Sequence, residues 1–198
     1  MEKYTNRNKK SQNTKAEREN DYAAAKTSEN SFLRHYEKKF GVELEDRSGD
    51  KKYQHRDIDF TRETSLGEIA YEVKNDTTCF AGKHTGNLFF ETTASYTYEN
   101  GVKDIRDGWW EITEADWLVV MYSFDEKEEY GCEMFYVDKL REIFDKNPDK
   151  LRNVISYNGC SGFVVNRQWL VNEIKKSDDE DIFDCNYIGL GYADRVEV

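Results

Sequence analysis

The sequence predicts an α/β domain with a mixed central sheet of about four to five strands flanked by helices. Three observations predict this class: apolar residues at helical spacing over 28–40, alternating polar and apolar residues over 53–60 and 68–74, and a continuous apolar run over 117–122. An amphipathic helix, half-buried strands and a strand covered on both faces are the elements from which such a domain is built.

The first predicted helix covers 28–40, where apolar side chains recur on one face, and Gly41 is expected to end it. Glu29 precedes Phe32 by three positions and Leu33 by four, so it is expected on the inward face of this helix. An acid at the buried edge of a helix is a candidate for chemistry.

The two alternating runs are expected to form a hairpin around a turn at 64–67. Ile58 and Phe60 then point to one face, and Asp57 and Asp59 to the other. In the second run, Ile69, Tyr71 and Val73 point one way, and Ala70, Glu72 and Lys74 the other.

This turn sets a register that places Asp59 opposite Glu72 and Asp57 opposite Lys74. Two opposed carboxylates repel each other unless a positive charge lies between them, and a divalent cation is the economical solution.

The remaining elements are predicted from shorter patterns. They are strands over 87–91, 132–137 and 163–165, a helix-opening cap at 113–116, a helix from Asp138 that ends before Pro148, and a helix over 166–176. The strand over 87–91 ends in another acid, Glu91.

Composition limits the class of protein. The chain has 198 residues, of which 37% are apolar and 14% aromatic, which fits one domain with an aromatic-rich core. No run approaches the roughly 20 apolar residues of a membrane span, and the first residues lack the apolar segment of a signal peptide. Four cysteines without a CxxC pair favour reduced thiols. A membrane protein and an exported protein are therefore not expected, and a cytoplasmic location is.

Charge is unevenly distributed along the chain. The 29 basic and 40 acidic residues give a net charge of −11. Residues 1–25 are predicted to form a mobile basic arm or, alternatively, a solvated helical lead-in, because the first 18 contain no Leu, Ile, Val or Phe. Residues 26–198 are predicted to be one domain, with an acidic C-terminal segment that includes five acids over 178–184.

The order of helix acid, strand Asp, strand Glu-x-Lys and strand Glu resembles the PD-(D/E)xK nuclease superfamily. Asp59 matches the motif's Asp, and Glu72-Val73-Lys74 matches its (D/E)xK. The Pro position holds Ile58, and Asp57 competes with Asp59 for the Asp.

Two further stretches resemble patterns of small phage nucleases. They are Thr85-Gly-Asn-Leu-Phe-Phe-Glu91 and Thr113-x-Ala-Asp-Trp117, so that the resemblance covers roughly residues 28–122.

The resemblance implies a restriction-endonuclease-like sheet and a Mg²⁺-dependent nuclease acting on DNA, including branched or single-stranded DNA, of a phage or bacterial kind, with Mn²⁺ as a substitute ion. Asp59, Glu72 and the backbone carbonyl of Val73 would hold the metal, and Lys74 would act as base or water positioner. Glu29, Glu91 and Asp57 would be auxiliary. Lys83 and His84 would contact nucleic acid, and a homodimer stays open.

Other interpretations fit the same residues. Glu72 and Lys74 could form an exposed salt-bridged strand face, and Glu29 could be an acid that stabilises a helix N-terminus. Cys79 with His84 gives a weak nucleophile pair. At the level of function, the charge of −11 favours an inert nuclease-like fold that mimics DNA or inhibits a basic defence or repair protein. An RNA-directed enzyme would use the same site.

Overall fold

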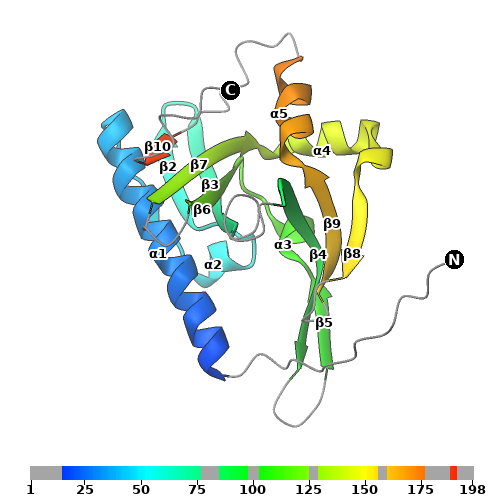
Figure 1. The fold of residues 1–198 in the computed structure, drawn as a ribbon. Coiled ribbons are helices and arrows are strands. Elements are labelled where there is room, and N and C mark those ends of the chain that lie inside the picture. Colours follow the sequence, from blue (N-terminus) through cyan, green and yellow to red (C-terminus); the bar gives the residue numbers. More distant parts are fainter. Residues whose placement is uncertain are drawn as a thin grey trace, which may run out of the picture.

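The computed structural model describes six stretches of the chain: residues 15–76, 85–97, 103–124, 129–155, 160–176 and 188–190. The fold is mixed α/β, as predicted, but it contains two sheets where one central sheet was expected (Figure 1). No helix among the described residues has both the length and the apolar character needed to cross a membrane.

The first sheet is mixed and has the strand order β1-β2-β3-β6-β7-β10. Its neighbours are antiparallel except for β3 and β6, which run parallel. The bounds are β1 Glu45–Asp46, β2 Phe60–Thr64, β3 Gly67–Asp76, β6 Trp117–Phe124, β7 Glu129–Tyr136 and β10 Ile188–Leu190.

The second sheet has the order β5-β4-β9-β8 and is antiparallel throughout. It consists of β4 Asn87–Thr97, β5 Lys103–Asp107, β8 Arg152–Ile155 and β9 Ser161–Asn166. The predicted strand over 87–91 is thus the first half of β4, and it pairs with β9 and β5.

The helices surround these sheets on different sides (Figure 1). They are α1 Lys15–Phe40, α2 Lys51–Gln54, α3 Trp109–Ile112, α4 Val137–Lys146 and α5 Arg167–Lys175, with a short 3-10 turn at Pro148–Lys150. Helix α1 begins well before the predicted start, so residues 15–25 have the helical form of the lead-in alternative. It ends where predicted, because Gly41 adopts a φ of 65° that favours glycine.

Strand β6 separates the two main cores, as its apolar run predicts. Leu118, Val120 and Tyr122 face the core shared with the second sheet and helices α3, α4 and α5. Val119 and Met121 face the core beneath α1, which also contains Phe32 and Tyr36 of that helix and Tyr71 and Val73 of β3. The first sheet is therefore covered on both faces, and β3 lies next to its most buried strand.

Two local predictions are wrong. Residues 53–60 are not one strand: Asp50 caps α2 by accepting a hydrogen bond from the Lys52 amide, and β2 begins only at Phe60. Consequently Ile58 and Phe60 enter two different apolar clusters instead of one face. No helix opens at 113–116: Thr113 ends α3, and Asp116 accepts a hydrogen bond from the Ala70 amide next to the start of β6.

Candidate active site

Strand β3 supplies the centre of the site. Tyr71 and Val73 pack beneath α1, so Glu72 and Lys74 project from the opposite face, as the alternation predicts. Glu72 is nevertheless only 3% exposed. This burial excludes the interpretation of Glu72 and Lys74 as an exposed salt-bridged face.

The predicted hairpin register is confirmed. Over β2, Phe60 pairs with Tyr71 and Thr61 with Ala70, as predicted. The ladder begins at Phe60, so the predicted strand pairs Asp59–Glu72 and Asp57–Lys74 do not form. Asp59 lies just before β2, and its amide donates to the Tyr71 carbonyl at 2.9 Å. Its side-chain Oδ2 accepts a hydrogen bond from the Val73 amide at 2.9 Å. Asp59 is therefore held against β3 by both its backbone and its carboxylate.

The chain turns at Asp57, before β2 begins. The part of β3 that follows Tyr71 therefore has no pairing with β2. Asp57 has a φ of 50°, in the left-handed region that Asp tolerates better than most residues. The amide and carbonyl of one strand residue point to the same neighbour, so the Val73 carbonyl points to the edge where Asp59 lies. The backbone ligand that the family resemblance implies is consequently directed at the predicted site.

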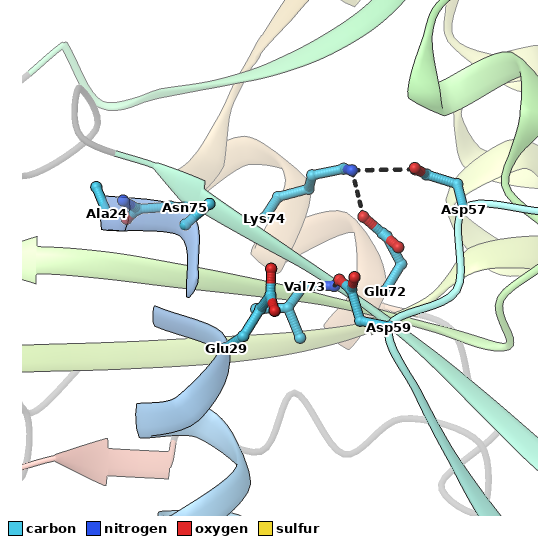
Figure 2. Close-up of a pocket in the computed structure, with 9 residues that line it drawn as sticks. Ala24, Glu29, Asp57, Asp59, Glu72, Val73, Lys74 and Asn75 are labelled. Atoms are coloured by element: carbon cyan, nitrogen blue, oxygen red, sulfur yellow. Dashed lines mark hydrogen bonds and ion pairs between the residues drawn. The ribbon is translucent and has the colours of Figure 1, made fainter. Parts of the chain in front are cut away.

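The amine of Lys74 lies between two carboxylates, those of Glu72 and Asp57. It forms ion pairs with Glu72 and, at 3.0 Å, with Asp57 (Figure 2). The same nitrogen lies 5.1 Å from the centre of the Trp109 ring, at the start of α3. Asp57 and Asp59 are thus not alternatives: the structure brings both to the site, Asp57 to the lysine and Asp59 to the backbone of Val73.

Glu29 reaches the site from α1. Asp59 lies between it and the two acids that pair with Lys74 (Figure 2). The Glu29 side chain is 14% exposed and pairs with Lys26 at 3.0 Å. Because α1 begins at Lys15, Glu29 lies in the middle of the helix, and the interpretation as an N-terminal acid does not hold.

These side chains line one cavity of about 430 Å³. Its walls come from α1, the segment before β2, and β3, and they present four carboxyl groups, one amine and one amide. The lining residues are Ala24, Ala25, Glu29, Asp57, Asp59, Glu72, Val73, Lys74 and Asn75.

Two buried oxygens in this cavity have no hydrogen-bond partner among the described residues. They are Oε2 of Glu72 and Oδ1 of Asn75. A third buried oxygen, Oδ2 of Asp57, lies 3.0 Å from the Lys74 amine, and no group in the described stretches forms a hydrogen bond with it. Buried polar atoms are normally satisfied, so such a group of oxygens requires an explanation.

The electrostatics reflect several charges in a confined space. Burial raises the pKa of Asp59 to about 6, although the attraction of Lys74 and the Val73 amide oppose this. Burial also raises the pKa of Glu72 well above its ordinary value, against the attraction of Lys74. Burial lowers the pKa of Lys74, but the attraction of Glu72, Asp57 and Asp59 outweighs it and raises that pKa.

The donor chemistry fits a hard divalent cation. Mg²⁺ takes oxygen ligands, and the lining of the cavity includes Glu72, Asp59, Asn75 and the backbone of Val73. In the described part of the chain, however, no three His, Cys, Asp or Glu side chains are already arranged as a metal-binding group. Lys74 instead neutralises Glu72 and Asp57.

Sequence reasoning missed two neighbours of the site. Asn75 directly follows the Glu-x-Lys motif, but its parity places it on the other face of β3, so the motif gave no reason to include it. Trp109 is partly buried, and its ring borders Lys74. Only the spatial approach of α3 to β3 identifies this contact.

Other predicted residues lie elsewhere. Glu91 is on β4 in the second sheet, opposite Gly162 of β9, and does not line the cavity. Lys83 and His84, proposed to contact nucleic acid, and Cys79 lie outside the described residues.

Comparison with protein-family models, with curated proteins and with solved structures finds no match to this chain.

Proposed function

We propose that this protein is a Mg²⁺-dependent nuclease of the PD-(D/E)xK type that hydrolyses phosphodiester bonds of DNA in the cytoplasm of a bacterium or of a phage-infected cell. One observation carries the proposal: Asp59, Glu72 and Lys74, which match the motif, line a single cavity. The unpartnered Oε2 of Glu72 supports it, because a buried carboxylate oxygen normally has a partner.

Asp59, Glu72 and the Val73 carbonyl would hold the ion. When bound, Mg²⁺ supplies a Lewis acid and a water with a lowered pKa, which phosphodiester hydrolysis requires. Asp59 is well prepared for this role, since the Val73 amide fixes one of its oxygens at 2.9 Å. Glu29, on the opposite wall of the cavity, would orient water.

The structure supports one of the two roles predicted for Lys74. The pKa of its amine is raised by Glu72, Asp57 and Asp59, so the amine carries a proton at neutral pH. A protonated amine donates hydrogen bonds and cannot accept a proton. This supports a role in orienting the attacking water and stabilising negative charge on the phosphate, and argues against a role as general base.

The test is cleavage of plasmid, single-stranded and branched DNA, and of RNA, in Mg²⁺ or Mn²⁺. We expect Glu72→Gln, Asp59→Asn and Lys74→Met each to reduce the rate by about 100-fold or more, the usual scale for an electrostatic contributor. Glu63→Gln, an exposed acid on β2, and Lys175→Met, an exposed base on α5, are matched controls that keep full activity.

Folding must be measured beside activity, particularly for Lys74. A prediction from the sequence alone is that Lys74→Ala abolishes cleavage and leaves folding intact. Because the amine neutralises buried Glu72, we instead expect removal of Lys74 to destabilise the metal-free protein as well. Circular dichroism and urea unfolding separate the two effects. Full cleavage by folded Glu72→Gln and Lys74→Met proteins would contradict the proposal.

The net charge of −11 favours the competing function, an inert acidic mimic of DNA or an inhibitor of a basic protein. A wild-type protein that cuts none of these substrates and instead elutes with a basic partner would favour that function. The homodimer stays a prediction; it would be measured by light scattering.

A further inference from the structure

A short basic segment lies beside the cavity of this acidic protein. Residues 51–56 contain Lys51, Lys52, His55 and Arg56 and no acid, in a chain whose net charge is −11. They comprise helix α2 and the turn that leads to Asp57, which pairs with Lys74. A concentration of positive charge therefore sits immediately before the first acid of the site.

Three cations surround one aromatic ring in this segment. The guanidinium carbons of Arg47 and Arg56 lie 4.7 and 5.9 Å from the centre of the Tyr53 ring, and the Lys52 amine lies 5.0 Å from it. Tyr53 itself is 6% exposed, and its hydroxyl donates to Glu68 at 2.9 Å. The ring is thus fixed, and the three cations lie against it.

Contacts before and at the end of the segment tie it to neighbouring elements. Before it, Lys26 of α1, which also pairs with Glu29, contacts Ser48 at 2.8 Å and Asp46 at 3.3 Å. At the end, the Arg56 carbonyl accepts a hydrogen bond from the Glu114 amide at 2.9 Å. The position of the segment relative to the cavity is therefore set by contacts on both sides.

The cations differ in how they are held. Arg47 pairs with Glu45 and Arg56 with Glu114, so both guanidinium groups are tied to neighbouring acids. Lys51 and Lys52, in contrast, are exposed on the outer side of α2. These two lysines are the members of the segment best placed to meet an anionic partner.

We propose that this basic segment, residues 51–56 with Lys51 and Lys52 as its leading contacts, binds the phosphate backbone of duplex DNA and places the substrate over the cavity. The inference rests on the proposed nuclease function. Its physical reason is that nucleic-acid affinity comes mainly from Lys and Arg contacts with phosphates, which fix the register of the substrate without reading sequence. An acidic protein needs such a local surface, because its overall field repels DNA.

The test measures binding separately from cleavage. A fluorescently labelled DNA duplex is titrated with protein in EDTA, which prevents hydrolysis, and anisotropy is followed over about 50–200 mM salt. The variants are K51Q/K52Q and, as a matched control, K38Q/K39Q, another exposed lysine pair, at the C-terminal end of α1. The control pair lies at least nine residues beyond Glu29, roughly 14 Å along the helix.

We expect K51Q/K52Q to bind more weakly and to reduce the slope of log K against log salt by about 2, one for each lost phosphate contact. The K38Q/K39Q control keeps the wild-type slope. With Mg²⁺ present, K51E/K52E should lose cleavage while Mg²⁺ still raises its melting temperature, because the cation site is unchanged.

Each result distinguishes the two proposals. A wild-type protein that binds and cuts DNA while K51Q/K52Q keeps the full salt slope overturns this inference and leaves the nuclease proposal standing. A wild-type protein that binds DNA through these lysines but cuts nothing overturns the nuclease proposal alone. A wild-type protein that neither binds nor cuts DNA overturns both.

Discussion

Glu72 and Glu133 are buried glutamates in the same sheet, with 3% and 2% of their surface exposed, and each is paired with a cation. Their surroundings differ. Glu133 on β7 has both oxygens occupied: Arg167 reaches both, and Tyr122 donates to Oε2 at 2.7 Å. Glu72 on β3 has Lys74 on one oxygen and no hydrogen bond on the other among the described residues.

This difference separates a structural ion pair from a candidate site. Arg167 offers several fixed donors, and with Tyr122 it satisfies Glu133 without help from outside the protein. Lys74 is a single amine shared between Glu72 and Asp57, with Asp59 close by. The first cluster is complete, whereas the second keeps a surplus of acidic oxygens that a cation or a substrate can use. Four experiments test this contrast.

The largest effect is expected at the complete cluster. Arg167→Met leaves Glu133 buried without its cation, which should lower the free energy of unfolding by about 3–5 kcal/mol. Urea unfolding measures this loss. Lys175→Met on the same helix is the control and should change stability by about 0.5 kcal/mol or less, because its side chain is exposed. A loss below about 1 kcal/mol for Arg167→Met would show that the Glu133 cluster is not structural.

Magnesium should stabilise the protein through the Glu72 cluster. A ligand that binds only the folded state adds about 2.7 kcal/mol when its concentration is 100 times its dissociation constant. Thermal unfolding in EDTA and in excess Mg²⁺ measures the gain, which Glu72→Gln should abolish and Glu63→Gln should keep. An equal gain in wild type and Glu72→Gln would place the ion elsewhere.

The raised pKa of Asp59 predicts the sign of a pH effect. Since burial raises this pKa from 3.8 to about 6, the folded metal-free protein holds the proton more tightly than the unfolded chain. The corresponding stability is complete below about pH 4 and is lost as pH rises through 6.

Asp59→Asn removes this titration and still lets a side-chain oxygen accept from the Val73 amide. In EDTA, we expect the variant to exceed wild type by about 3 kcal/mol at pH 7 and to match it near pH 4. The charge of Asp59 is one cause of the raised pKa of Glu72, so the variant also relieves part of that shift, which acts in the same direction at pH 7. A variant less stable than wild type at pH 7 would contradict the prediction.

The smallest effect is expected for Tyr122→Phe. The variant removes one hydrogen bond to Glu133 but leaves Arg167 in place, so the loss should be about 1 kcal/mol. Urea unfolding at neutral pH measures it. A loss as large as that of Arg167→Met would mean that Arg167 alone does not satisfy Glu133.

Several features of the site were predictable because they depend on neighbours in the chain. The turn at 64–67 sets the register of β2 and β3, and the alternation of β3 sets the faces of Glu72 and Val73. The apolar run over 117–122 likewise predicts a strand buried on both faces, which β6 is. Each of these follows from two-residue periodicity and turn length.

Other features depend on contacts between distant segments. Residues 57–60 alternate like a strand, but the Asp50 cap starts α2 and Asp57 turns the chain, which sends Ile58 and Phe60 into separate cores. The strand that carries Glu91 was predicted, but its sheet was not, because β4 joins the second sheet by pairing with β9, about seventy residues later.

The sequence by itself determined the α/β class, the hairpin register and the three motif residues, since periodicity and turn length are local properties of the chain. Only the tertiary structure decided that Asp57 and Asp59 both belong to the site, that Glu29 reaches it from α1, and that Glu91 does not line it. It also decided that buried Glu72 has one oxygen without a hydrogen bond among the described residues, while both oxygens of Glu133 are paired. Burial and pairing depend on which distant segments pack against a side chain, and that information is absent from any short stretch of sequence.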